Sequence, residues 1–173
     1  MRVRVFVRMR WFAILGVIIA TLIASRVFYI GFSTLPVYII CAFMVLYNLV
    51  LLHQVRGLKA EKAGSVIQKG RRYSNLHISL DLIALIVLLH FAGGIENPFI
   101  FLFVSHVILA SIALHYKVVY VVATTALSLV ILLAGLEYVG AIPHVNLEGF
   151  AAPMLYKEAS YILAVLVALA AIL

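Results

Sequence analysis

The sequence predicts an all-α integral membrane protein with six transmembrane helices. The chain of 173 residues is 66% hydrophobic and only 11% charged, and its apolar runs recur at lengths close to a membrane span. A bilayer core about 30 Å thick needs roughly 20 helical residues, and about 17 suffice. A soluble domain of this length has no core large enough to bury so much apolar surface. A water-soluble fold is therefore excluded.

The apolar runs place the spans in order along the chain. We expect them at about residues 11–30, 36–53, 76–92, 98–115, 118–136 and 158–173. Pro36 suits the start of the second helix, because a missing N–H is tolerated in the first turn. The longest polar connection is residues 54–75, and its glycines are expected to break any long helix there. These glycines are Gly57, Gly64 and Gly70.

Residues 1–173 are interpreted as one membrane domain without a soluble domain inside it. Between the last two spans, residues 145–150 are expected to lie in the membrane interface as an amphipathic patch. The sixth span carries no polar residue after Tyr161 and reaches Leu173, the final residue given. We therefore expect the sixth helix to be truncated there and a cytoplasmic region to follow it in the whole protein.

The distribution of basic residues predicts the orientation. With the N-terminus inside, eleven Lys and Arg fall on the inner side and only two, Arg26 and Lys157, on the outer side. The positive-inside rule then places both termini in the cytoplasm. The net charge of +7 flanks the spans without interleaved aromatic residues, so acidic lipid headgroups are the expected partner and nucleic acid is not.

The connection between the third and fourth spans is the most specific feature of the chain. Gly93 and Gly94 are expected to end a helix by adopting positive φ. Asn97 is expected to cap the next helix, whose first residue is Pro98. Such a turn explains these four residues without any ligand. It leaves Phe99 unexplained, and a helix N-terminus at the membrane edge can also bind a carbonyl or an anion.

Residues 93–99, GGIENPF, match the heptapeptide GGxxNPF of redox-responsive sensor histidine kinases of the RegB/PrrB/ActS type, and residues 80–82 resemble the start of the same helix. The six spans and the short outer connection are also similar, so the resemblance covers most of the chain. It implies a signal-input domain that senses the quinone pool, ubiquinone or menaquinone, through this loop. The expected quinone-binding residues are Gly93, Gly94, Asn97, Pro98, Phe99 and the nearby His90.

The resemblance also implies the setting of the domain: a bacterial inner membrane, a homodimer, and a response regulator as partner of the cytoplasmic region. ATP and the phosphoacceptor histidine would belong to that region. This chain itself shows none of the GxSxG, HExxH or Walker patterns, so no catalytic residue is predicted in it. Small residues on the first span, Gly16, Ala20 and Ala24, are spaced for close approach of a second helix and support a dimer.

Asp81 is the only acid deep within an apolar run, and His77 lies four residues earlier on the same helix face. A carboxylate inside a membrane has a partner or a function. Two interpretations stay open: Asp81 pairs with His77, Arg71 or Arg72 at the inner loop, or it takes part in signal transmission.

The remaining polar residues of the spans are interpreted as structural. His106, together with Ser105, is expected to form hydrogen bonds across helices. Cys41 is expected to be a small core residue.

Two other functions are compatible with parts of the sequence. A small transporter or channel would place polar groups or broken helices at the bilayer midplane, whereas the break predicted here lies at the outer edge. A periplasmic metal or proton sensor is suggested by the outer acids with His90, His144 and Glu148. Their spacing matches no standard metal motif, and no metal site is predicted.

Overall fold

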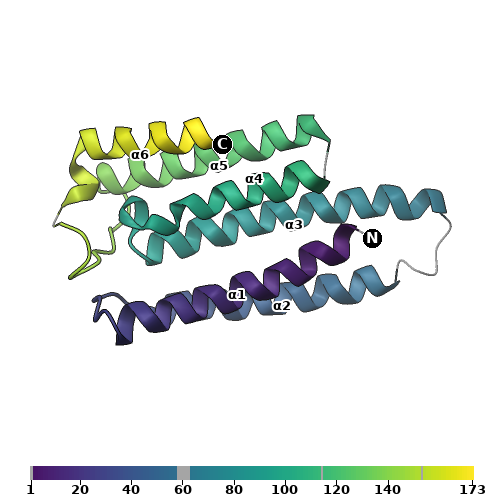
Figure 1. Ribbon diagram of the computed structural model, residues 1–173, viewed down its shortest axis with the longest axis horizontal. Coiled ribbons are helices and arrows are strands. Elements are labelled where there is room, and N and C mark those ends of the chain that lie inside the picture. Colours follow the sequence, from purple (N-terminus) through teal and green to yellow (C-terminus); the bar gives the residue numbers. More distant parts are fainter. Residues whose placement is uncertain (1, 58–62, 114, 153) are drawn as a thin grey trace.

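The computed structural model describes residues 2–57, 63–113, 115–152 and 154–173. In these residues six α-helices lie roughly along one common axis (Figure 1). They are α1 (Arg2–Arg26), α2 (Thr34–Gly57), α3 (Ala63–Phe91), α4 (Leu102–Ala113), α5 (Tyr116–Tyr138) and α6 (Ala159–Ile172). Three short 3₁₀ turns complete the description: η2 (Gly94–Glu96), η3 (Pro98–Phe101) and η4 (Leu155–Lys157). The predicted all-α, six-helix fold is confirmed.

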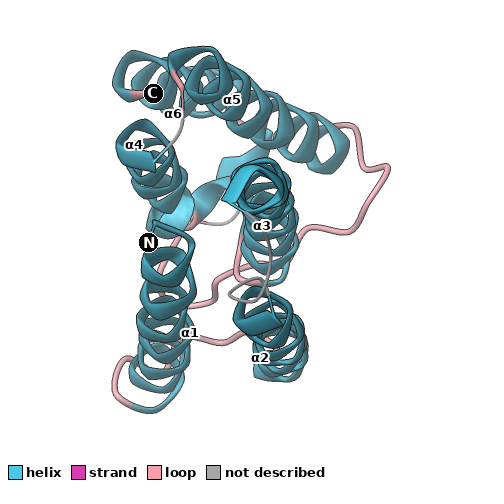
Figure 2. Ribbon diagram, turned by 90° about the vertical axis from the view of Figure 1, so that its right-hand side faces the viewer, coloured by secondary structure: helices cyan, strands magenta, loops and turns pink. Residues whose placement is uncertain are grey.

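Helix α3 lies at the centre of the bundle. The hairpin of α1 and α2 packs on one side of it, and α4 and α5, with α6 against α5, lie on the other (Figure 2). The larger apolar core, between α3 and the later helices, contains Leu89 and Phe103. The smaller core, between α1, α2 and α3, contains Val37 and Cys41. Cys41 is thus the buried core residue that the sequence predicted.

The outside of the bundle is apolar as well. Phe12, Leu46 and Ile112 are each more than half exposed. Such a surface is costly in water and expected in lipid. Among the described residues, the helix Tyr116–Tyr138 is long and apolar enough to cross a membrane by itself. Shorter apolar helical segments are Thr34–Val50, Leu76–Phe91, Pro98–Ile112 and Ala159–Ile172.

Several helix boundaries differ from the predicted spans, most of all those of α1 and α3. Helix α1 begins at Arg2 and ends at Arg26, not at residue 30. Helix α3 begins at Ala63, so the expectation that Gly64 and Gly70 break the helix is wrong. A glycine costs about 1 kcal/mol in a helix interior. That cost is tolerated because extending an existing helix needs no new nucleation.

The end of the bundle opposite the N-terminus holds the α1–α2 turn, the α3–α4 connection and the α5–α6 loop (Figure 1). We call it the outer end, after the predicted orientation. Gly31 and Glu148 exchange backbone hydrogen bonds of 3.0 and 3.3 Å, and Leu147 is buried. Within residues 145–150, Leu147 therefore packs on the bundle, whereas Phe150 is 53% exposed. The placement of this segment in the membrane interface stays a prediction.

Candidate functional site

The α3–α4 connection folds back under the α5–α6 loop because two glycines allow it. Gly93 and Gly94 have φ values of +106° and +54°, as the sequence predicted. A Cβ atom on Gly93 would lie 2.4 Å from the side chain of Leu147. A Cβ atom on Gly94 would lie 2.2 Å from a carboxylate oxygen of Glu137. Both glycines therefore serve close packing against α5 and the loop that follows it.

Asn97 holds the next turn of the connection. Its Oδ1 accepts the backbone N–H of Phe99 at 2.8 Å, and its Nδ2 donates to the carbonyl oxygen of Ala92 at 2.5 Å. Pro98 follows in the first position of η3, so the predicted capping is confirmed. Both polar ends of the Asn97 side chain are therefore occupied by bonds within the turn. Of the five expected quinone-binding positions in this turn, Gly93, Gly94 and Asn97 are buried, and only Pro98 and Phe99 are exposed.

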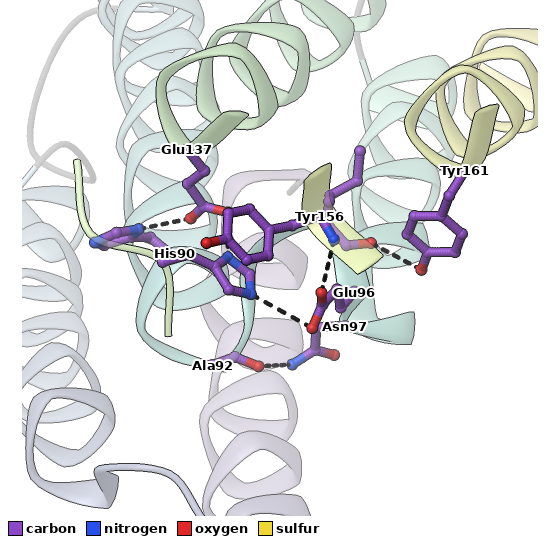
Figure 3. A network of polar contacts seen from close by, with 9 residues as sticks. His90, Ala92, Glu96, Asn97, Glu137, Tyr156 and Tyr161 are labelled. Atoms are coloured by element: carbon purple, nitrogen blue, oxygen red, sulfur yellow. Dashed lines mark hydrogen bonds and ion pairs between the residues drawn. The ribbon is translucent and has the colours of Figure 1, made fainter. Parts of the chain in front are cut away.

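The carboxylate of Glu137 joins two histidines at the end of α5. His90 Nδ1 lies 2.8 Å from its Oε1, and His144 Nδ1 lies 2.7 Å from its Oε2. The Glu137 side chain is completely buried, and 17% of the His90 side chain is exposed. Figure 3 shows Glu137 reaching down from α5 toward His90. A single buried acid thus connects α3, α5 and the α5–α6 loop.

Glu96 extends these contacts to the last helix. Its Oε1 accepts the backbone N–H of Tyr156 at 2.8 Å (Figure 3). Its Oε2 lies 3.4 Å from His144 Nε2, within ion-pair distance, although the angles do not meet those of a hydrogen bond. The hydroxyl of Tyr161, on α6, donates to the carbonyl of the neighbouring Ile95 at 3.4 Å. We call His90, Glu96, Glu137 and His144 the outer network.

His144 is the most enclosed imidazole of the outer network. Its side chain is 2% exposed, and its ring stacks on that of Tyr156 with centroids 3.9 Å apart. Burial lowers the pKa of His144. The hydrogen bond and charge of Glu137 and the charge of Glu96 outweigh burial, so that the net pKa is raised above its ordinary value of 6.5.

Asp81 and His77 lie apart from the outer network, nearer the other end of α3. Asp81 forms an ion pair with Arg10 of α1 and accepts the hydroxyl of Tyr47 of α2 at 2.6 Å. The guanidinium of Arg10 lies 4.7 Å from the centre of the Tyr47 ring. We call Arg10, Tyr47 and Asp81 the inner cluster. Its contacts connect α1, α2 and α3.

The expected pairing of Asp81 with His77 is wrong. Both ring nitrogens of the buried His77 lack hydrogen-bond partners among the described residues, and only its backbone carbonyl is contacted, by Arg10 at 3.4 Å. A guanidinium reaching across from α1 is the stronger partner for a carboxylate. The side chains of Arg71 and Arg72, the other expected partners, lie outside the described ones.

His106 also differs from its prediction. Its Nδ1 lies 2.9 Å from the carbonyl of Leu102, one turn earlier in its own helix. The hydroxyl of Ser105 donates to the same carbonyl at 2.6 Å. Both side chains therefore bond to the backbone of α4 itself and not to a neighbouring helix. Ser and His side chains in a helix can reach the carbonyl oxygen of the preceding turn, which retains a free lone pair.

Sequence reasoning did not single out Glu137, Arg10 or Tyr47. Arg10 was counted only as an inner flanking charge, and Glu96 only as a variable position of the heptapeptide. One feature of the sequence could have indicated Glu137: it is one of only six acids in the chain, and it directly follows the predicted fifth span. Glu148, expected beside the histidines, contacts Gly31 instead. Among the described residues, no three His, Cys, Asp or Glu side chains are placed to share a metal ion.

Comparison with known proteins gives one match. Residues 9–172 match the family of the PilS-like transmembrane domain. PilS is a sensor histidine kinase. No curated protein and no solved structure shows a significant match to the chain. The match supports a membrane domain of a sensor kinase, whereas the redox-responsive type stays a prediction.

Proposed function

Since the chain belongs to the family of PilS-like transmembrane domains, we propose that it is the membrane input domain of a two-component sensor histidine kinase and that it senses the quinone pool at residues 93–99. The family makes it a multi-pass membrane protein. We place it in a bacterial inner membrane with its N-terminus in the cytoplasm, because eleven of its thirteen Lys and Arg then lie inside.

The exposed ring of Phe99 is the observation that carries the quinone proposal. The side chain of Phe99 is 41% exposed, while its backbone N–H is fixed by Asn97. Packing of the turn does not by itself require an aromatic ring at a position so exposed. At the membrane edge such a ring offers a flat face on which a quinone headgroup can stack.

His90 supplies a hydrogen-bonding group beside this loop and favours one redox form. Its Nδ1 faces an oxygen of Glu137, and a carboxylate can only accept, so Nδ1 carries the proton. Nε2 of the neutral ring is then an acceptor, which suits the hydroxyl of a reduced quinol. An oxidised quinone carbonyl is itself an acceptor and finds no donor at Nε2 in this tautomer.

The loop is connected to the helix through which a signal would leave the domain. Glu96 holds the backbone of Tyr156 in η4, and Ile95 accepts the hydroxyl of Tyr161 in α6. A ligand that moves residues 93–99 therefore pulls on the start of α6. The kinase region, with its ATP, phosphoacceptor histidine and response-regulator contact, would follow α6 in the whole protein.

A homodimer completes the proposal. Gly16 lies on an exposed part of α1, and a Cβ atom there would meet nothing within 4 Å. Ala20 and Ala24 continue the row at four-residue spacing. Ala20 and Ala24 are half-buried, so the exposed Gly16 is the position of this row at which the backbone of a second α1 can approach closely.

Quinone binding to the purified domain in lipid nanodiscs tests the proposal. Oxidised and reduced ubiquinone and menaquinone are titrated against the native chain, Phe99→Leu and the control Phe101→Leu. Phe101 is a matched control because it is 43% exposed and lies outside the heptapeptide. We expect Phe99→Leu to lose about fivefold in affinity, the value of one aromatic contact, and Phe101→Leu to bind like the native chain. No binding by the folded native domain would refute the quinone proposal.

A further inference from the structure

The outer network brings four titratable side chains together: His90 and Glu137 from the last turns of α3 and α5, and Glu96 and His144 from the connections that follow these helices. Glu137 and Glu96 are 0% and 2% exposed. His144 lies between them, with one ring nitrogen facing each carboxylate. His90 faces the remaining oxygen of Glu137. The quinone proposal uses the exposed side of His90 but gives no role to the other three.

Burial of two carboxylates favours the binding of a proton by this group. Two ionised carboxylates beside two neutral imidazoles would leave two uncompensated negative charges buried, which is costly. A proton added to His144 makes both of its ring nitrogens donors. Nδ1 then donates to Glu137, and Nε2–H faces Glu96 at 3.4 Å. The cationic ring also gains from stacking on the electron-rich face of Tyr156.

Among the residues that the structure describes, the groups that face His144 are Glu137 from α5, Glu96 from η2, Tyr156 from η4, and His90 from α3 through Glu137. Lys157 is nearby, with its Nζ 5.8 Å from the centre of the Tyr156 ring on which His144 stacks. Tyr161 of α6 contacts the loop beside Glu96. The two carboxylates are nearer to His144 than the lysine and set the sign of the local field.

We propose that the outer network is a proton-binding site on the extracytoplasmic side, in which protonated His144 holds the α3–α4 loop to α5 and to the start of α6. Loss of the proton leaves Glu96 and Glu137 opposed across a neutral ring. Glu96 then moves toward water and releases the N–H of Tyr156. The domain therefore responds to external pH. This inference rests on the input-domain function but not on quinone as the ligand.

The direction of the response follows from the raised pKa of His144. A histidine whose pKa is higher in the folded than in the unfolded chain stabilises the fold fully below the unfolded value of about 6.5. That stabilisation is lost as the pH rises through the folded pKa. The closed arrangement is thus the low-pH form, and a rise of the external pH through the raised pKa of His144 opens it.

The test is a pH titration of the whole chain in nanodiscs without quinone. The ¹⁵N chemical shifts of the histidine rings report protonation of His144, and EDTA is present in a parallel series. We expect a His144 midpoint above 6.5, unchanged by EDTA. Glu96→Gln keeps an oxygen for Tyr156 but removes the charge, and we expect it to lower the midpoint by about one pH unit. The control His115→Gln alters an exposed histidine at the other end of the bundle and should leave the midpoint unchanged.

Three results would overturn the proposal: a native His144 midpoint below 6.5, an unchanged midpoint in folded Glu96→Gln, or a midpoint that shifts with EDTA, which would indicate a bound metal. Glu137→Gln serves as a second variant with the same expected direction. If quinone does not bind, the quinone proposal fails but the pH titration of His144 still tests the proton site. If quinone binds but His144 shows no titration, only the proton-site proposal is rejected.

Discussion

Replacement of Gly94 by Ala tests whether the α3–α4 loop is packed directly onto the outer network. Ala is strained at φ +54°, where a non-glycine residue costs about 1 kcal/mol. Its Cβ atom would also lie 2.2 Å from Glu137 Oε2, so the carboxylate must move. That oxygen accepts from His144 at 2.7 Å, and a hydrogen bond to a charged group contributes about 2 kcal/mol. We therefore expect a loss of about 3 kcal/mol in the free energy of unfolding.

The matched control is Gly135→Ala, at a helical site in α5 where a Cβ atom meets nothing within 4 Å. There the better helix propensity of alanine should stabilise the chain by up to about 1 kcal/mol. Thermal unfolding in one detergent compares the two variants. For a chain of this size 3 kcal/mol corresponds to a fall in Tm of about 10 °C, while the Tm of Gly135→Ala should stay level or rise.

A double-mutant cycle isolates the contact with Glu137. In Glu137→Ala the carboxylate is gone, so adding Gly94→Ala should cost only the backbone strain of about 1 kcal/mol. Additive effects of the two substitutions would mean that Gly94 does not face Glu137. An unchanged Tm for Gly94→Ala alone would refute the packing of the loop described here.

Three further predictions concern the rest of the bundle. Asp81→Asn leaves the buried guanidinium of Arg10 without its counter-charge and should lower the free energy of unfolding by about 3 kcal/mol; denaturant unfolding measures this, and a native-like midpoint would contradict it. Gly16→Ile should keep the fold but weaken chemical cross-linking of two copies, because the added side chain blocks close helix approach; equal cross-linking would exclude α1 as the dimer interface. In a background without the native cysteine, a cysteine at exposed Asn146 should be labelled only from outside and one at exposed Tyr116 only from inside; the opposite pattern would invert the topology.

The sequence was most informative where structure depends on neighbouring residues. The cap of Asn97 on Phe99, Pro98 at the start of η3 and the positive φ of Gly93 are local effects, and each was predicted. The apolar runs predicted the helices because lipid sets their length. The same local reasoning failed at Gly70, where continuation of a long helix outweighed the propensity of one residue.

The contacts between helices were beyond sequence reasoning. A helix that is apolar all round gives no signal of which face meets which neighbour. The pairing of Arg10 with Asp81 and of His144 with Glu137 therefore required the three-dimensional arrangement. Because charged partners in these pairs come from different elements, their spacing along the chain carries no motif. The outer network was visible in sequence only as a scatter of acids and histidines.

The most direct test of the central claim is the distance between residues 93–101 and the start of α6 when quinone binds. Spin labels at Phe101 and Glu158, both exposed, report this distance by pulsed electron paramagnetic resonance in nanodiscs, with Cys41 replaced. The account predicts that quinone changes the distance distribution in the native background, and that Glu96→Ala, which removes the acceptor of the Tyr156 N–H, abolishes the change. An unchanged distribution at saturating, demonstrably bound quinone would contradict the claim that a ligand at this loop is transmitted to α6.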